Sequence, residues 1–207
     1  MEKIICVAGP TASGKTRLAV ELAKKYDGEV LSCDSMQIYK GMAIGTAAPT
    51  IDEMQGVPHH MIGVADPAED FSVGKYVELA EPVLQDILSR GKTCVVCGGT
   101  GLYADSLLLG RSFAPCPSTG VREALEQEAE QRGIEPLLER LRLVDPEAGA
   151  KLHPSDKRRI IRALEVFLET GQTISEHNRK TKLLAPKHEA VWLGLSFANR
   201  QDLYDRI

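Results

Sequence analysis

The sequence predicts an α/β fold in which a parallel sheet with flanking helices carries an all-helical insertion domain. Over residues 1–111, short apolar runs alternate with segments of helical periodicity. This alternation is typical of a parallel sheet whose strands are buried on both faces. From residue 112 to about residue 184, no strand-like run occurs and helical segments follow one another, which favours a separate helical insertion.

Five apolar runs are the expected strands, because each is too short for a helix and is bounded by Gly, Pro, Asp or Ser. They cover residues 4–8, 30–32, 61–64, 93–97 and 191–197. Helices are expected between them at residues 15–26, 72–89 and 102–109. The resulting β-α-β order predicts a doubly wound sheet with fully buried strands.

The insertion is expected to hold helices at residues 121–132, 136–143 and 156–169. Proline-containing stretches at 113–118 and 185–187 mark its entry and exit. We therefore predict two domains. Residues 1–112 together with 185–207 form the α/β core, and residues 113–184 form the helical insertion domain.

Net charge argues at first against a nucleic-acid ligand, because the 207 residues sum to −4 and phosphates are bound by Lys and Arg. The charge is unevenly distributed, however. Residues 151–182 hold eight basic and four acidic side chains, a net of +4, so the rest of the chain carries −8. The molecule is bipolar, and its basic part suits a polyanion.

Cysteine and histidine patterns do not predict a redox or metal centre. The five cysteines are odd in number and widely spaced, which excludes a disulfide framework. Cys94 and Cys97 form a C-x-x-C pair, but residues three apart on a strand face opposite sides, so we expect buried thiols. The adjacent His59 and His60 diverge and have no third ligand at a usual spacing.

No apolar run in the sequence is long enough for a signal peptide or a membrane span. We therefore expect a soluble, cytoplasmic protein without a membrane partner.

Residues 9–16 satisfy the phosphate-binding pattern G-x-x-x-x-G-K-[ST] between an expected strand and an expected helix. Backbone N–H groups of such a loop converge on an anion at a helix N-terminus. Lys15 offers a positive charge to the outer phosphates, and the Thr16 hydroxyl is placed to bind Mg²⁺. The pattern predicts a P-loop NTPase-like core and a set of residues that bind a phosphate or a diphosphate: Gly9, Pro10, Thr11, Ala12, Ser13, Gly14, Lys15 and Thr16.

Two further loops follow strands at the carboxyl edge of the sheet, where ligands bind in open α/β folds. The second strand is followed by Asp34, Ser35, Met36 and Gln37. Asp34 can act as a general base or bind a metal, and Gln37 can pair with a nucleobase. The alternative is a turn capped by Asp34 with Gln37 in solvent. A glycine turn leads to Thr100, which is either a helix N-cap or a site residue.

The motifs together resemble the tRNA isopentenyltransferase (tRNA dimethylallyltransferase) family in order and spacing over nearly the whole chain. The resemblance rests on residues 9–16, 34–40, 58–60, 98–103, 152–154 and 156–166. It implies transfer of the dimethylallyl group from dimethylallyl diphosphate to N6 of the adenosine 3′-adjacent to the anticodon of tRNA. The products are N6-dimethylallyladenosine and diphosphate.

The same resemblance implies roles for the motif residues and Mg²⁺ as a cofactor. Asp34 accepts the proton of the attacking amine, Lys15 and Mg²⁺ on Thr16 stabilise the leaving diphosphate, and Thr100 lies near N6. The implied partners are dimethylallyl diphosphate and the anticodon loop of tRNA, whose target base must be flipped out. A monomer is implied. The implied tRNA-binding residues are Asp34, Ser35, Met36, Gln37, Thr100, Arg122, Arg158, Arg159 and Arg162.

The basic helix at 156–169 supports RNA contact independently of the family. Arg158 and Arg162 lie one turn apart, and two like charges there repel unless an anion lies between them. The alternative is a solvated stripe with a weak surface pair between Arg162 and Glu165. The same helix is expected to bury an apolar face formed by Ile160, Leu164, Phe167 and Leu168.

Two other functions fit the phosphate-binding loop. One is a P-loop kinase of a small molecule or nucleotide, in which Asp34 binds Mg²⁺ or activates a hydroxyl. The other is a nucleotide-dependent RNA-binding switch without chemistry. Members of the resembled family continue beyond the position of Ile207. We therefore expect this chain to be an inactive or weakly active truncation that keeps the diphosphate site.

Overall fold

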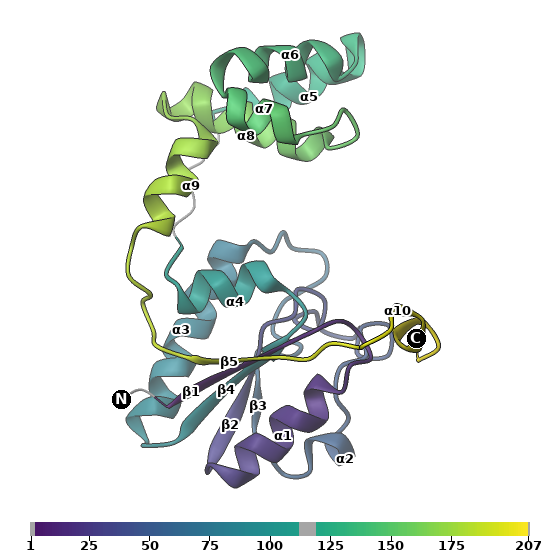
Figure 1. The fold of residues 1–207 in the computed structure, drawn as a ribbon, viewed down its shortest axis with the longest axis vertical. Coiled ribbons are helices and arrows are strands. Elements are labelled where there is room, and N and C mark those ends of the chain that lie inside the picture. The colour runs from purple at the N-terminus through teal and green to yellow at the C-terminus, as the bar shows by residue number, and fades with distance from the viewer. Residues whose placement is uncertain (1–2, 112–118, 207) are drawn as a thin grey trace. The chain divides into compact units, whose positions relative to one another are not determined.

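The computed structural model describes residues 3–111 and 119–206, which fall into two compact units (Figure 1). The core unit is Met1–Arg111 with Pro186–Ile207, and the insertion unit is Ser112–Ala185. The expected entry linker at 113–118 lies outside the described residues. Among the described helices, none combines the length and apolar character needed to cross a membrane.

The core unit contains a five-stranded, all-parallel sheet in the order β3-β2-β4-β1-β5. The strands are β1 (Ile4–Ala8), β2 (Gly28–Ser32), β3 (His59–His60), β4 (Thr93–Gly98) and β5 (Val191–Gly194). The three central strands β1, β2 and β4 are mostly buried, as their apolar runs predict. The parallel α/β prediction is therefore confirmed.

Two expected strands differ from the prediction. The third is His59–His60 rather than 61–64, because Met61 and Gly63 have positive φ angles that turn the chain. The fifth is short and is not buried: Val191 is 62% exposed and Trp192 is 43% exposed. β5 pairs with β1 at the sheet edge, and an apolar sequence run does not show whether its strand is central or at an edge.

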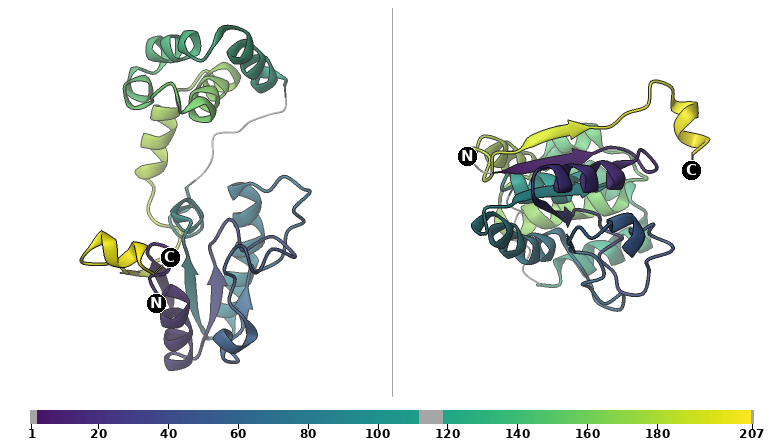
Figure 2. Two further views of the ribbon diagram at one scale, coloured as in Figure 1. Left: turned by 90° about the vertical axis from the view of Figure 1, so that its right-hand side faces the viewer. Right: turned by 90° about the horizontal axis from the view of Figure 1, so that it is seen from below.

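Helices cover both faces of the sheet, as Figure 2 shows. The core-unit helices are α1 (Lys15–Lys25), α2 (Ile51–Met54), α3 (Val73–Ser89), α4 (Gly101–Leu108) and α10 (Arg200–Tyr204). Alternate residues of β4 face opposite layers: Cys94 packs in the cluster with α3 and α4, and Cys97 packs in the cluster with α1. Both thiols are free, so the expected buried strand cysteines are confirmed.

The insertion unit consists of α5 (Val121–Arg132), α6 (Glu135–Val144), α7 (Pro146–Lys151), α8 (Lys157–Thr170) and α9 (Ile174–Lys182). The helices α5, α6 and α8 confirm the three expected helices within one or two residues. We did not expect α7, which is short, or α9, whose residues are almost all polar. Asp145 is the N-cap of α7, and its carboxylate accepts hydrogen bonds from Ala148 N of α7 and Ser175 N of α9, 3.0 Å each; the N-cap of α9 is Thr173.

The face of α8 that packs in the insertion differs from the predicted one. Leu168 was expected on the apolar face but is 42% exposed. Glu165 was expected at the surface but is only 4% exposed, so it is buried like Ile160 and Leu164 of the same helix. Pairing with two arginines makes its burial possible, and periodicity along one helix cannot show partners on another helix.

Candidate active site

Three loops meet at the carboxyl edge of the sheet because their strands are neighbours. Register aligns Ala8 of β1 with Gly98 of β4, and Ser32 of β2 with Cys97 of β4. A cavity of about 470 Å³ lies between the loops that follow these ends. It is lined by Thr11, Ala12, Ser13, Gly14, Lys15, Thr16, Arg17, Asp34, Gln37, Thr46, Ala47, Glu53, Cys97, Gly98, Gly99 and Arg206.

The P-loop turns into α1 at Gly14, whose φ of +85° is in the left-handed region that favours glycine. Lys15 Nζ donates a 2.6 Å hydrogen bond to the carbonyl of Pro10, so the ammonium group lies back over the loop. The Ser13 hydroxyl is buried and has no hydrogen-bond partner among the described residues. An anion in the loop would satisfy both groups, which makes the P-loop a candidate diphosphate site.

Asp34 is fixed beside the P-loop by its own backbone. Its Oδ1 accepts hydrogen bonds from the N–H groups of Met36, at 2.9 Å, and Gln37, at 3.4 Å. The ends of β2 and β4 pack closely beside this turn: a Cβ added at Gly98 would collide with the carbonyl oxygen of Cys33, so this approach of the two backbones requires glycine. Within the described residues no hydrogen bond reaches Asp34 Oδ2, so this oxygen is available as a proton acceptor.

Thr100 connects the second glycine turn to the Asp34 loop. Its Oγ1 accepts a 2.9 Å hydrogen bond from Ser35 N and donates a 3.2 Å hydrogen bond to Ser35 Oγ. Thr100 occupies the N-cap position of α4, but its side chain makes no capping hydrogen bond there. Thr100, Ser35 and the half-exposed Met36 stand beside the cavity rather than in its lining.

Gln37 lines the cavity but is not simply solvated. Its Oε1 accepts from Ser32 Oγ at 3.3 Å, and its Nε2 donates to the carbonyl of Ala47 at 3.2 Å. The amide therefore connects the end of β2 to the loop at 42–48. Thr46 and Ala47 of that loop form part of the cavity wall, and the sequence pattern gave no indication of this.

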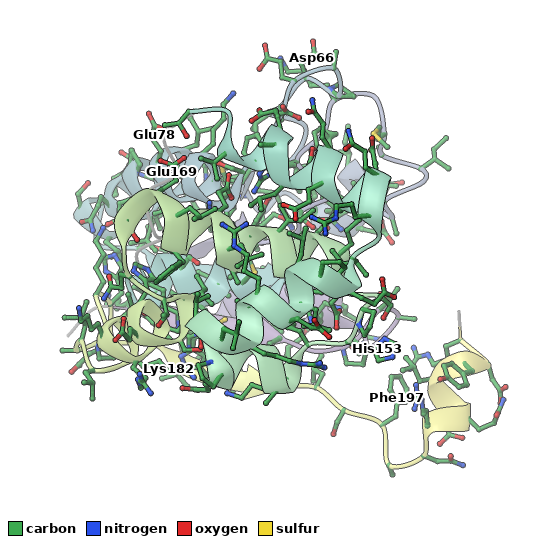
Figure 3. The ribbon with its side chains drawn as sticks, turned by 90° about the horizontal axis from the view of Figure 1, so that it is seen from above. Asp66, Glu78, His153, Glu169, Lys182 and Phe197 are labelled. Carbon is green, nitrogen blue, oxygen red and sulfur yellow. The ribbon has the colours of Figure 1, made fainter. Side chains whose placement is uncertain are left out.

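Arg206 and Glu53 are two further cavity residues that the sequence analysis missed. Arg206 follows α10 and lines the cavity. Its guanidinium lies over the ring of Phe197, 5.5 Å from the ring centroid, and Phe197 is labelled in Figure 3. No local pattern marks a single arginine after a short helix. Glu53 belongs to a capping box with Thr50, visible as T-x-x-E in the sequence, and these hydrogen bonds lower the pKa of its carboxyl.

The donor set of the cavity fits a magnesium ion. The Thr16 hydroxyl and the Asp34 carboxylate both line it, and Mg²⁺ prefers oxygen ligands, often one or two from protein with the rest from phosphate and water. Cys97 is the nearby sulfur, and burial raises the pKa of its thiol to about 11, so it stays neutral near pH 7. A soft thiolate ligand is therefore absent from the described lining of this cavity.

The predicted tRNA-binding arginines lie in the insertion unit. Glu165 accepts two hydrogen bonds of 3.0 Å from Arg122 and one of 2.9 Å from Arg162. This carboxylate supplies an anion for Arg162, so repulsion from Arg158 does not by itself require an external one. Arg159 lies 3.7 Å from Asp156.

The geometry above can be compared with known proteins. A family model described as IPP transferase matches residues 37–207. The chain belongs to the IPP transferase family. A second model, described as isopentenyl transferase, matches residues 2–62, which include the P-loop.

Curated relatives in the IPP transferase family align with the whole chain. The tRNA dimethylallyltransferase of Caldanaerobacter subterraneus subsp. tengcongensis is 48% identical over an alignment of 207 residues that covers 99% of this chain and 66% of the relative. That of Geobacillus thermodenitrificans is 47% identical and covers 100% of this chain and 65% of the relative. The chain thus spans just under two thirds of the length of these relatives.

Solved structures of the IPP transferase family share the fold. A eukaryotic dimethylallyltransferase described as acting on tRNA has a TM-score of 0.83 and 32% identity, covering 100% of this chain and 52% of that one. A full-length tRNA isopentenylpyrophosphate transferase from Bacillus halodurans has a TM-score of 0.65 and 40% identity, covering 100% of this chain and 63% of that one.

Proposed function

We propose that this chain carries the catalytic part of a tRNA dimethylallyltransferase. It would transfer the dimethylallyl group of dimethylallyl diphosphate to N6 of the adenosine 3′-adjacent to the anticodon. The observation that supports this most is the single cavity in which the P-loop, with its unsatisfied Ser13 hydroxyl, faces the carboxylate of Asp34. Relatives named tRNA dimethylallyltransferase, at 43–48% identity, make the allylic diphosphate the ligand to test first.

In the proposed reaction, the diphosphate of the donor lies in the loop formed by Gly9, Pro10, Thr11, Ala12, Ser13, Gly14, Lys15 and Thr16. Lys15 would leave the carbonyl of Pro10 and move to the anion, because a phosphate oxygen is a stronger acceptor than a peptide carbonyl. Backbone N–H groups at the start of α1 add to the stabilisation of the departing charge. Arg17 and Arg206 contribute two further cations to the lining of the same cavity.

The transfer itself exchanges one bond for another. The N6 lone pair attacks the allylic carbon C1, the C1–O bond breaks, and its electron pair leaves with the diphosphate. Asp34 Oδ2 accepts the proton that N6 loses, while Oδ1 stays hydrogen-bonded to backbone N–H groups and keeps the carboxylate oriented. Thr100 holds the backbone of Ser35, and so the Asp34 turn, from the other side.

Mg²⁺ bound at Thr16 would neutralise charge on the leaving diphosphate, which is the chemistry a divalent cation supplies in such sites. On the RNA side, Ser35, Met36, Gln37 and Thr100 would surround the flipped adenine, since all of them follow the strand ends beside Asp34. Arg122, Arg158, Arg159 and Arg162 of the insertion domain would contact the tRNA backbone. From the family resemblance we further propose that the chain acts as a monomer in the cytoplasm.

The decisive experiment is a comparison of ligands. The chain is titrated with dimethylallyl diphosphate and, separately, with ATP, each with Mg²⁺, in a calorimeter. We expect tighter binding of the allylic diphosphate. Clear preference for ATP would instead support a P-loop kinase and overturn the proposal.

The chemical step is tested with a labelled donor and an unmodified anticodon stem-loop. Asp34→Asn keeps the size of the side chain but removes the proton acceptor, so transfer should fall by about 10²-fold or more with donor affinity retained. Transfer at the original rate by Asp34→Asn would remove Asp34 as the base.

A further inference from the structure

The insertion unit contains a groove of about 580 Å³ between α7, α8 and α9, within the size range of about 300–1,000 Å³ seen for ligand sites. Its rim is cationic and its floor includes apolar side chains from all three helices. The lining is Arg122, Glu147, Ala148, Lys151, Leu152, Arg158, Arg159, Arg162, Ala163, Ile174, Ser175, Asn178, Arg179 and Lys182. Seven of these side chains are basic and one is acidic.

The one acidic side chain of the lining is already paired. Glu147 accepts a 2.8 Å hydrogen bond from Lys151 and one of 3.0 Å from Arg179. These contacts, with the Lys151 hydrogen bond first, hold the pKa of the Glu147 carboxyl below its usual value. Glu147 is therefore ionised at neutral pH and offsets only one of the seven positive charges, so the groove stays strongly cationic.

A second carboxylate lies under the groove and orients its rim. Glu165 is 4% exposed and accepts hydrogen bonds from both Arg122 of α5 and Arg162 of α8. The two arginine side chains are 49% and 30% exposed and both line the groove. A buried charge is costly unless it is paired, so Glu165 fixes both guanidinium groups in one arrangement.

The basic side chains surround the groove on two sides. Arg158, Arg159 and Arg162 come from α8, and Arg179 and Lys182 come from α9. Cations on two walls of the groove can contact several phosphates at once. They therefore suit an RNA strand, which carries one negative charge per nucleotide, better than a ligand with a single anionic group. Arginine also matches the phosphate group with paired donors.

We propose that this groove binds the phosphodiester backbone of RNA between α8 and α9, with Arg179 and Lys182 as the second wall and Glu165 as the positioning residue for Arg122 and Arg162. The inference rests on the proposed function for the identity of the ligand as RNA. It adds the α9 wall and the buried carboxylate to the arginines of α5 and α8.

The first test is the salt dependence of binding to an anticodon stem-loop RNA. Arg179→Ala/Lys182→Ala removes the α9 wall, and both side chains are exposed, so folding is not at risk. Each lost phosphate contact makes the negative slope of log K against log salt shallower by about 0.7–0.9. For the double variant we expect the slope to become shallower by about 1.4–1.8.

The matched control for that variant is Lys157→Ala/Lys180→Ala, which removes the same charge from α8 and α9 at positions outside the groove lining. It should change the slope by clearly less than the groove variant. Equal slopes for the two double variants would overturn the proposal, because general charge rather than the groove would then account for binding.

The second test separates positioning from charge. Glu165→Gln makes the insertion more positive, so general electrostatics predicts tighter RNA binding. The proposal predicts weaker binding, by about tenfold, as for the loss of one charge-assisted hydrogen bond. Glu130→Gln of α5 is the control, since it makes the same charge change at an exposed position. Tighter or unchanged binding by Glu165→Gln, with a melting curve like that of the original chain, would refute the positioning role.

Measuring the binding of dimethylallyl diphosphate distinguishes failure of the groove proposal from failure of the proposed function. All groove variants should bind the donor as the original chain does, because their substitutions lie in the insertion unit. If donor binding is intact and the groove variants bind RNA normally, this inference fails alone, and the groove serves another ligand such as an acidic protein segment. If the original chain binds ATP in preference to the donor, the proposed function fails.

Discussion

Glu29 on β2 is a buried carboxylate surrounded by three cationic or ionisable groups. It is 3% exposed, accepts two hydrogen bonds from Arg90, at 2.5 and 2.9 Å, and lies 2.9 Å from Lys92 Nζ and 2.8 Å from His60 Nε2. The hydrogen bonds from Arg90, which outweigh the opposing effect of burial, hold the pKa of Glu29 far below its ordinary value of 4.5. His60, which neighbours His59, is thus a hydrogen-bond partner of Glu29.

Replacing Glu29 with Gln removes the charge at nearly constant volume. Breaking a buried ion pair costs about 3–5 kcal/mol. The partner side chains are 30–39% exposed and regain some water, so we expect a loss of about 2–3 kcal/mol in the free energy of unfolding at pH 7. Urea unfolding followed by circular dichroism measures this loss.

The pH dependence is the sharper part of this prediction. Because the pKa of Glu29 is depressed in the folded state, its stabilisation is complete above the unfolded value near 4.5 and is lost as the pH falls toward the folded value. The stability difference between the original chain and Glu29→Gln should therefore shrink by about 1.4 kcal/mol for each pH unit below 4.5. A difference that stays constant from pH 7 to pH 3 would refute the reasoning.

Glu78 provides the control for this experiment. It lies on α3, where its side chain is exposed, and it is labelled in Figure 3. Glu78→Gln should change the free energy of unfolding by less than about 0.5 kcal/mol at any pH in the series.

Three further predictions follow from single contacts. Lys15→Ala should weaken diphosphate binding about 10- to 100-fold in calorimetry, whereas Lys25→Ala at the far end of α1 should leave it unchanged. Thr100→Val leaves the Ser35 N–H without its acceptor, so urea unfolding should show a loss of about 1–2 kcal/mol that Thr100→Ser restores; equal losses in both variants would argue against the hydrogen bond. Asp145→Ala removes the N-cap of α7 and leaves the Ser175 N–H in the first turn of α9 without its acceptor, so it should cost about 2–3 kcal/mol; a loss of less than about 0.5 kcal/mol would contradict these two roles.

The phosphate-binding loop could be predicted because its geometry is local. A left-handed glycine, a preceding strand and a following helix are all specified within a few residues of Gly14, and the structure has each of them. The central strands could be predicted for the same reason, since burial on both faces leaves a continuous apolar run. The edge strand β5 has a similar run but lies exposed, which local composition cannot show.

The polar contacts were not predictable in the same way. Nothing near Gln37 in the sequence indicates a hydrogen bond to Ala47, and nothing near Arg206 indicates a place in the same cavity as Lys15. Glu165 looks like a surface residue of an amphipathic helix until Arg122, on another helix, is brought beside it. Each of these contacts joins residues that lie apart in the sequence and that the packing of the fold brings together.

The alternating α/β core, the helical character of the insertion, the P-loop and the chemistry that its side chains allow all follow from the amino-acid sequence. Which of those side chains meet depends on the three-dimensional fold. The register of β2, β4 and β1 brings the loops of Asp34, Thr100 and Lys15 to one edge. Packing of α5 against α8 buries Glu165 between two arginines. Periodicity and motifs involve residues close together in the sequence, so they can be recognised in a short segment. These contacts join distant segments, and no single segment shows which other segment it will pack against.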